Sequence, residues 1–478
     1  MEAKQIIFFL GSMATVPLGI SIAQRSPTAL TLVFFVLVFG TTHPDSIFGL
    51  PSDIHFLSRE WYRGTTRGIE ISYLDLLAVI LLFGALRTRA RERLPLRKMP
   101  GFGAMTAYFT WALFTVVALS EPKIFGMFEL TKIFRGMLLF AAVAAYLRSP
   151  KHVSVFVFAL VAIVFYEAAL ALYQRYALGM HRISATLGHP NSLSTYCLQI
   201  LPIVLSVWFA QDASKRLRYS CLLSTLLIAG TIFLTVSRTG FAALVILSLL
   251  TLFLNTRGNW SPRNVGLIFA LAIVMSGMVF KSWDTISERF QGFSLEDEYL
   301  AEGGDRGSYF RLGIPALQDH PIAGIGLNNW SYWITNKYAP SIGDTRTPYH
   351  SLDEGPAQLN QNAPAHNLYL LTGVELGLVG LGLFLLMIFR WMHIAGSGAF
   401  RRKVGFIQHV QLGTFLSLLG VLMQSFTEWT FRQTPIFFLG HIIMGVAMFL
   451  FLNKPPHRTQ SARLAKPLEP VQLPKGRI

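Results

Sequence analysis

The chain has 478 residues, of which 52% are hydrophobic and only 14% are charged. A soluble globular domain carries about 25% charged residues. The composition therefore excludes a soluble protein of this size, and also a disordered chain, a collagen, a coiled coil and a disulfide scaffold. The net charge of +16 is typical of nucleic-acid-binding proteins, but its distribution along the chain points elsewhere.

The chain is divided into apolar segments bounded by Pro, Gly, Asn or charged residues. Backbone groups in lipid must form hydrogen bonds within their own segment, and the alternating stretches of a membrane barrel are absent. The sequence therefore predicts an all-α polytopic membrane helix bundle. Segment 27–40 is short for a crossing helix, so the count stays at twelve or thirteen and the side of the N-terminus stays open. The expected segments are 5–23, 27–40, 71–86, 102–119, 128–147, 153–176, 191–210, 220–235, 239–254, 264–280, 366–389, 405–426 and 434–452.

Lys and Arg residues concentrate in alternate loops. One set of loops, together with the tail 453–478, sums to +20, whereas the intervening loops sum to −4. Cytoplasmic loops of membrane proteins carry the excess of Lys and Arg. The charge is therefore a topology signal that places the +20 side in the cytoplasm, and we expect the protein to contact membrane lipids and no nucleic acid. In a bacterium the membrane would be the inner membrane. The opposite side, in a Gram-negative cell, is the periplasm.

One predicted outer loop, 281–365, is far longer than the others. Loops of this length are uncommon in compact proteins and are often functional. It opens with an acidic stretch, 296–305, and continues with Phe310, Ile314 and Leu317 at helical spacing, which predicts a short amphipathic helix. His320 then begins a turn, and the simplest alternative for the whole loop is a solvated cap.

Three arginines from distant parts of the sequence fall on the predicted outer side: Arg182, Arg238 and Arg311. A guanidinium group stays charged and binds phosphate oxygens with two parallel hydrogen bonds. His189 and Asn191 stand at a predicted helix start, where backbone N–H groups can bind an anion. These arginines are candidates to hold a lipid-linked diphosphate, and the alternative for each is an arginine that reaches to the membrane surface.

His366 lies at the outer start of a predicted span and can exchange a proton near neutral pH. The alternative is an interfacial histidine bonded to backbone. Glu375 lies nine residues deeper, where an acid is expected to be functional or paired. Gly377 and Gly380 are expected to let another helix approach closely.

Other charges fall inside predicted spans. Glu129 and Lys132 are spaced to pair within one helix, and Lys132 or Arg135 can pair with Asp75 across helices. The two cysteines, Cys197 and Cys221, lie at different depths, so no disulfide is expected. No nucleotide-binding or zinc-site motif is present, and we expect neither a cofactor nor a metal.

Four segments together resemble the O-antigen ligase and polymerase superfamily of bacterial membrane glycosyltransferases. In the last segment, His366 and a polar residue precede nine residues and then Gly-x-x-Gly, which is a ligase-type pattern. The O-antigen polymerase pattern of Arg, fifteen residues and Gly fails at both Arg306 and Arg311, so the resemblance favours a ligase. The segments are RISATLGHPNSLSTY, TVSRTGFAAL, SYFRLGIPALQDHPIAGIGLNNW and HNLYLLTGVELGLVG.

The resemblance implies a reaction. Members take a glycan from undecaprenyl diphosphate on the periplasmic face; ligases transfer it, with inversion and without a metal, to a sugar hydroxyl of lipid A–core, and polymerases transfer it to another lipid-linked glycan. In this chain Arg182, Arg238 and Arg311 would hold the diphosphate and Arg311 would assist catalysis. His366 would be the base. His320, His189, Asn191 and Glu375 are further candidates.

Two other functions stay open beside the ligase and the O-antigen or exopolysaccharide polymerase. A multi-span anion transporter, of the bicarbonate type, would show an inverted repeat with broken helices, and no convincing repeat is present. A structural partner of the polysaccharide machinery is the other. The expected domains are the N-terminal membrane helices 1–160, an O-antigen ligase-related membrane domain 161–452 and a disordered basic cytoplasmic tail 453–478.

Overall fold

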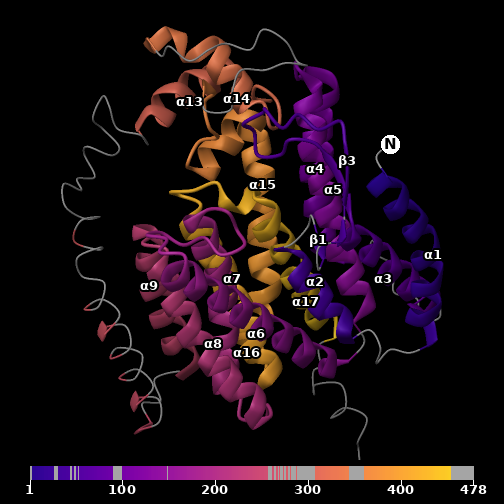
Figure 1. Cartoon of the computed structure of the whole chain (residues 1–478), viewed down its shortest axis with the longest axis vertical. Helices are drawn as coiled ribbons and strands as arrows, with labels where there is room; N and C mark the ends of the chain where they lie inside the picture. Colours follow the sequence, from indigo (N-terminus) through magenta and orange to yellow (C-terminus); the bar gives the residue numbers. More distant parts are fainter. Residues whose placement is uncertain are drawn as a thin grey trace, which may run out of the picture.

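A computed structural model describes residues 3–25, 31–42, 46–47, 50–51, 53–89, 99–147, 149–256, 307–343 and 360–453, with isolated residues between 261 and 287. Long helices run along the vertical axis of Figure 1, and short helices gather at its upper end. The helices of the bundle are the short α2 (Thr31–Gly40) and the longer α1 (Ala3–Arg25), α3 (Tyr73–Arg89), α4 (Phe102–Phe114) with its π-helical end Thr115–Leu119, α5 (Lys123–Tyr146), α6 (Pro150–Leu172) with its π-helical end Tyr173–Ala177, α7 (Pro190–Phe209), α8 (Lys215–Leu234), α9 (Arg238–Thr256), α15 (Leu368–Arg401), α16 (Phe406–Gln424) and α17 (Thr434–Leu452).

The upper end of the molecule carries the shorter elements. They are α13 (Gly307–Asp319), α14 (Trp330–Trp333), the π-helix Ile334–Tyr338 and the 3-10 helices Pro340–Ile342 and Thr430–Arg432. Two antiparallel strand pairs lie in the predicted outer loop 41–70 and were not expected: β1 (Ser46–Ile47) with β2 (Leu50–Pro51), and β3 (Asp53–Phe56) with β4 (Ile69–Ser72).

Among the described residues, eight helices are long and apolar enough to cross a membrane. The predicted all-α membrane bundle is therefore confirmed, and the chain is a multi-pass membrane protein. Helix α2 has 10 residues and a length of about 15 Å, half the hydrocarbon thickness, and it is not one of these eight. Most of segment 264–280, the acidic stretch 296–305 and the tail beyond Asn453 lie outside the described residues.

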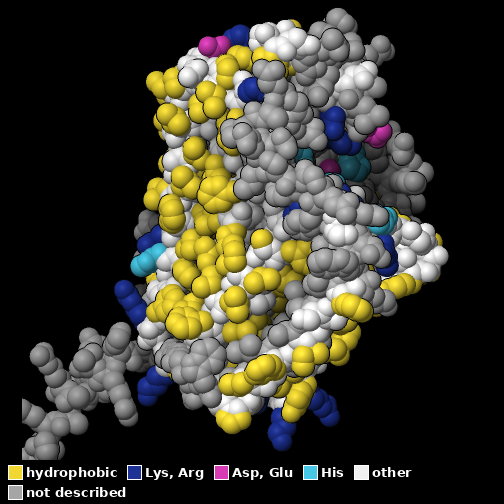
Figure 2. Space-filling view, turned by 90° about the vertical axis from the view of Figure 1, so that its left-hand side faces the viewer, with side chains coloured by type: hydrophobic (Ala, Val, Ile, Leu, Met, Phe, Trp, Pro, Cys, Tyr) yellow, Lys and Arg dark blue, Asp and Glu magenta, His cyan; other side chains and the backbone are white. Residues whose placement is uncertain are grey.

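The outer surface of the bundle is suited to lipid. Large apolar side chains on the spans are more than half exposed, including Val117, Leu249, Phe253 and Phe389. Figure 2 shows such side chains covering one face, with Lys and Arg side chains projecting at the end opposite to α13 and α14. This arrangement supports the topology read from the loop charges.

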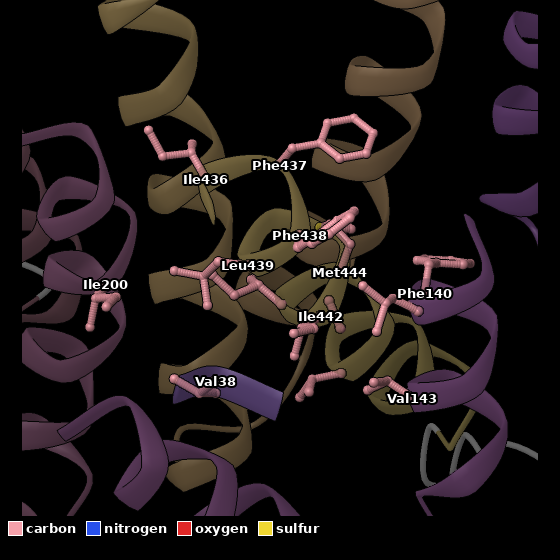
Figure 3. Packing of buried hydrophobic residues seen from close by; sticks show 14 of the residues in the cluster. Val38, Phe140, Val143, Ile200, Ile436, Phe437, Phe438, Leu439, Ile442 and Met444 are labelled. Carbon is pink, nitrogen blue, oxygen red and sulfur yellow. The ribbon is translucent and has the colours of Figure 1, made fainter. Parts of the chain in front are cut away.

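Helices α7 and α17 form the interior of the bundle. Almost every residue of both is buried. Figure 3 shows Phe438, Leu439, Ile442 and Met444 of α17 between Ile200 of α7 and Phe140 of α5. Small residues allow close packing: a Cβ on Gly413 of α16 would lie 2.5 Å from Cα of Ile203. The two cysteines are buried and unbridged, as predicted.

Helix α15 is broken at Gly377, where φ is 69° and ψ is −178°, a conformation that essentially only glycine adopts. The backbone carbonyls of Val374 and Glu375 accept hydrogen bonds from the amides of Ile325 and Gly326, each at 2.9 Å. The amide of Leu378 donates to the carbonyl of Pro321 at 2.8 Å. The element that approaches Gly377 closely is therefore the irregular segment 321–326 and not a helix. The amides of Ile325 and Gly326 are not used within a helix, so they can donate to the carbonyls that the break leaves unpaired.

One of two further expectations is met and the other needs correction. Gly380 faces the indole of Trp111 on α4, so a helix does approach there, and Nε1 of Trp111 donates to the carbonyl of Leu376 at 3.0 Å. Helix α13 forms as predicted, but its buried face consists of Leu312, Gly313 and Ala316. Ile314, which the helical spacing placed on that face, is 46% exposed. The prediction assumed that α13 packs through its largest aliphatic residues, whereas the small residues allow Trp330 and Leu370 to approach closely.

Candidate active site around His366 and Glu428

A buried carboxylate joins two predicted site residues. Nδ1 of His366 lies 2.8 Å from Oε2 of Glu428, and Nδ2 of Asn191 donates to the other oxygen at 2.5 Å. His366 immediately precedes the cap of α15, Asn191 lies in the first turn of α7, and Glu428 lies between α16 and α17. Only 3% of the Glu428 side chain is exposed, against 29% of His366.

This contact determines how His366 can react. An ionised carboxylate only accepts hydrogen bonds, so the proton of a neutral His366 resides on Nδ1. Nε2 is then the basic nitrogen, and the carboxylate stabilises the positive ring that forms when Nε2 takes a proton. The ring of Tyr309 on α13 lies 5.4 Å from the His366 ring, centroid to centroid. Glu428 thus orients the His366 ring, and Tyr309 of α13 borders it.

His189 and Arg182 belong to the same group. Nδ1 of His189 accepts a hydrogen bond from the amide of Asn191 at 3.2 Å and so caps α7. Desolvation is the largest cause of the lowered pKa of His189; the charge of Glu428 opposes the shift, and the charges of Arg182 and His366 add to it. The charges of these groups are therefore close enough to act on one another.

The loop that carries Arg182 is fixed by two buried or half-buried side chains of α6 and its π-helical end. Glu167 accepts from the hydroxyl of Thr186 at 2.6 Å and from its amide at 3.2 Å. Gln174 accepts from the amide of Ala185 at 2.8 Å and donates to its carbonyl at 3.0 Å. Nε of Arg182 donates to the carbonyl of Thr235, three residues before Arg238, at 3.4 Å. Arg182 is therefore held beside the start of α9.

The other two arginines are placed less closely. Arg238 is the half-buried first residue of α9, next to the segment that Arg182 contacts. Arg311 lies on α13 two residues after Tyr309, which is about 200° around a helix, and its side chain is exposed. Tyr309 of α13 faces His366. A phosphate-binding role for Arg238 and Arg311 stays a prediction.

His320 lies apart from this group. Its ring lies 5.4 Å from that of Trp333, at the far end of α13 and about 16 Å along the helix from Tyr309. Its Nε2 is buried and makes no hydrogen bond within the described part of the chain. His320 is therefore no neighbour of His366.

Glu375 is paired, as its depth predicted, but in a different cluster. Nη1 of Arg432 donates to Oε2 of Glu375, and the amide of Trp330 donates to Oε1 at 3.2 Å. Nε of Arg432 lies 3.2 Å from Oε1 of Glu129, whose other oxygen lies 2.7 Å from Nζ of Lys132. We call Glu129, Lys132, Glu375 and Arg432 the buried ion cluster. The buried ion cluster joins α5 and α15 to Arg432, which follows Glu428 by four residues. It therefore fixes the C-terminal end of the segment 428–432.

Two pairings expected from spacing are confirmed. Glu129 binds Lys132 within α5, and Nε of Arg135 donates to both oxygens of Asp75 on α3, at 2.9 and 3.0 Å. Sequence reasoning missed Glu428 and Arg432. Their charges cancel within the short outer loop 427–433, so the charge count gave no signal. Two opposite charges among aromatic residues, in TEWTFRQ, were the only hint.

In the described part of the chain, no three His, Cys, Asp or Glu side chains lie close enough to share a metal ion. The expectation of a metal-free reaction stays a prediction.

Comparison with known families identifies the region around this site. Residues 223–385 match the family model described as O-antigen ligase. This part of the chain is therefore similar to the O-antigen ligase family. The match covers about a third of the chain and includes Arg238, Arg311 and His366, whereas Arg182 and Glu428 lie outside it. No curated protein matches the chain.

This similarity confirms the resemblance seen in the sequence. The match supports a membrane function of the O-antigen ligase and polymerase superfamily. The matched region supplies His366, and segments outside it supply Glu428, Asn191 and Arg182, so the group around His366 is built from both parts of the chain. The broader domain limits 161–452 stay a prediction.

Proposed function

We propose that the chain is a glycosyltransferase that moves a glycan from a polyprenyl diphosphate, undecaprenyl diphosphate in bacteria, to a sugar hydroxyl. The acceptor in this proposal is lipid A–core, which makes the protein an O-antigen ligase. The observation that carries the proposal is the hydrogen bond from His366 to buried Glu428, beside Arg182, at the edge of the region that matches the O-antigen ligase family.

The proposed reaction is one displacement. The oxygen of the acceptor hydroxyl attacks the anomeric carbon, and the bond from that carbon to the diphosphate oxygen breaks. Nε2 of His366 takes the hydroxyl proton while Glu428 stabilises the protonated ring. The electron pair of the broken bond leaves with the polyprenyl diphosphate, and attack from the opposite side inverts the anomeric configuration. Neither a nucleotide nor a metal enters this scheme.

Arginines would stabilise the leaving group. Negative charge grows on the diphosphate as the bond breaks, and fixed cations lower the free energy of that transition state. Arg182 has the best support for this role because it is held beside the start of α9 and contributes to the lowered pKa of His189. Arg238 and Arg311 are assigned to the diphosphate from the family resemblance. The loop charges support a site on the periplasmic side of the inner membrane.

The broken helix α15 gives little support to a transporter. In transporters, the unwound carbonyls of broken helices coordinate ions. Here the carbonyls of Val374, Glu375 and Leu376 accept hydrogen bonds from Ile325, Gly326 and Trp111. These carbonyls are engaged by the protein itself, so the break serves to anchor segment 321–326.

The proposal is tested by supplying the purified chain, in detergent, with a lipid-diphosphate-linked oligosaccharide. One sample also contains lipid A–core and the other does not. Glycan on lipid A–core identifies a ligase. A ladder of longer lipid-linked glycans without that acceptor identifies a polymerase that uses the same site. No transfer in either sample, from protein with a normal thermal unfolding midpoint, would rule out the glycosyltransferase.

A further inference from the structure

A second concave site lies toward the C-terminal end of α13. It is a pocket of about 360 Å³ between the turn that precedes α5 and the segment formed by α14 and the following π-helix, lined by Glu121, Pro122, Tyr332, Trp333, Asn336 and Lys337. Figure 1 places α14 at the same end of the molecule as α13. None of these residues is used by the reaction proposed at His366.

The two walls of this pocket are fixed to each other. Nε1 of Trp333 donates to the carbonyl of Glu121 at 2.8 Å, and Nδ2 of Asn329 donates to the carbonyl of Pro122 at 3.2 Å. The ring of Tyr332 lies 6.1 Å from that of Phe125 on α5. The pocket is therefore formed before any ligand arrives, which reduces the entropy lost on binding.

The lining combines aromatic faces with hydrogen-bonding groups of both kinds. Trp333 and Tyr332 offer ring faces of negative potential, which attract the C–H bonds on the face of a sugar ring. Glu121 accepts hydrogen bonds, Lys337 donates them and Asn336 does both. Nζ of Lys337 lies 3.0 Å from Oδ2 of Asp319 and over the Trp333 ring, 5.6 Å from its centre, so the ammonium group is held against one face of that ring.

This chemistry distinguishes among ligand classes. An acyl chain cannot form hydrogen bonds with the carboxylate of Glu121 or the amide of Asn336. Glu121 and Asp319 each pair with one ammonium group, that of Lys123 at 3.8 Å and that of Lys337 at 3.0 Å, so the pocket offers a polyanion no net positive charge. A pyranose ring, with apolar faces and a rim of hydroxyl groups, uses all the features of the pocket.

The pocket is connected to the His366 site through a series of rings. Trp333 follows Trp330 by one turn, the ring of Trp330 lies 6.5 Å from that of Tyr309, and Tyr309 lies 5.4 Å from His366. Trp330 itself is buried, and His320 beside Trp333 lies about 16 Å along α13 from Tyr309, a separation that a glycan of several units can span. We propose that this pocket binds a pyranose unit of the glycan substrate at a distance from the reacting bond. The proposal rests on the proposed glycosyltransferase function.

The test is direct binding, without transfer, to the full-length chain in detergent. Isothermal titration calorimetry would use two soluble ligands that lack lipid and diphosphate: core oligosaccharide and the oligosaccharide of the repeating unit. We expect one of them to bind, which tells whether the pocket holds the acceptor or the donor glycan. Trp333→Ala should weaken binding by about tenfold or more, Trp333→Phe should retain most of it, and His366→Ala should bind as the wild type does.

Asn336→Ala provides a second variant with a smaller effect on the packing of α14, and the thermal midpoint of each variant shows whether it folds. Unchanged binding in both Trp333→Ala and Asn336→Ala would overturn the proposal, as would a wild type that binds neither oligosaccharide. Glycan transfer by the wild type without such binding would overturn the proposal for the pocket and leave the proposed glycosyltransferase function in place. Oligosaccharide binding that is lost in Trp333→Ala, together with no glycan transfer by the wild type, would support the proposal for the pocket and overturn the proposed glycosyltransferase function.

Discussion

Glu428 and His366 are 62 residues apart in the sequence, yet Oε2 of the first lies 2.8 Å from Nδ1 of the second. The carboxylate is almost completely buried, whereas the imidazole is partly open to the outside. This arrangement fixes one ring nitrogen and leaves the other as the base. It is the contact on which the proposed chemistry depends.

The first prediction concerns this carboxylate. Glu428→Gln keeps the size of the side chain but removes the charge that stabilises protonated His366. We expect the rate of glycan transfer to fall about 10- to 100-fold with little change in the KM for the donor, measured as initial rates at several donor concentrations. Glu60→Gln, the same change at an exposed outer residue, should leave the rate unaltered. Equal rates for the two variants would contradict the role of Glu428.

The second prediction concerns Arg182. Arg182→Lys keeps a positive charge but loses the forked geometry that binds two phosphate oxygens. We expect the KM for the lipid-linked donor to rise about tenfold, with less effect on the acceptor. Arg216→Lys makes the same change at an exposed residue at the start of α8 and should behave as the wild type. A rise in the acceptor KM alone would argue against diphosphate binding by Arg182.

Much of the fold was predictable because each apolar run is long enough to form a helix by itself. The start of α7 at Pro190, the pairing of Glu129 with Lys132 and the helix that contains Arg311 all follow from local spacing. Glu428 could not be found in this way, because nothing in its own loop indicates that His366 and Asn191 approach it from two other helices.

The break in α15 was hidden for a related reason. Gly377 was expected to sit at a helix–helix contact, because glycine in an apolar run most often serves close packing. Its actual role depends on the unpaired amides of segment 321–326, which come from a different part of the chain. The buried face of α13 was misjudged because it depends on the shape of Trp330, its partner.

The third prediction uses this break. A Cβ on Gly377 would lie 2.0 Å from the carbonyl oxygen of Ile322, and alanine does not adopt its backbone angles. Gly377→Ala should therefore destabilise the protein by about 3 kcal/mol or more, seen as a lower thermal midpoint. Gly382→Ala in the same helix meets no atom within 4 Å and is the matched control. If the two variants melt alike, the account of the break is wrong.

The fourth prediction concerns the buried ion cluster. Arg432→Met leaves the carboxylates of Glu129 and Glu375 buried without their shared partner. Removing one member of such a group costs about 3–5 kcal/mol, so we expect a large drop in the thermal midpoint. Arg216→Met removes an exposed arginine instead and should change the midpoint little. A small drop in both variants would mean that the cluster does not hold the segment between Glu428 and Arg432.

The fifth prediction is a pH dependence. Because the folded protein lowers the pKa of His189, the unfolded chain binds more protons between that pKa and the ordinary value of about 6.5. Stability should therefore be fully present above about pH 6.5 and decrease as the pH falls through this window. His189→Asn retains an acceptor that caps α7 and should lose less stability than the wild type between pH 7.5 and 5.5. An identical pH dependence of the thermal midpoint in both proteins would contradict this reading.

The central claim is tested most directly by the rate of glycan transfer catalysed by His366→Ala. Its control is His181→Ala, which removes an exposed histidine from the neighbouring outer loop. The account predicts a loss of about 10²- to 10⁴-fold for His366→Ala, with donor binding unchanged and with full activity in His181→Ala. A His366→Ala enzyme that transfers glycan within twofold of the wild-type rate would contradict it.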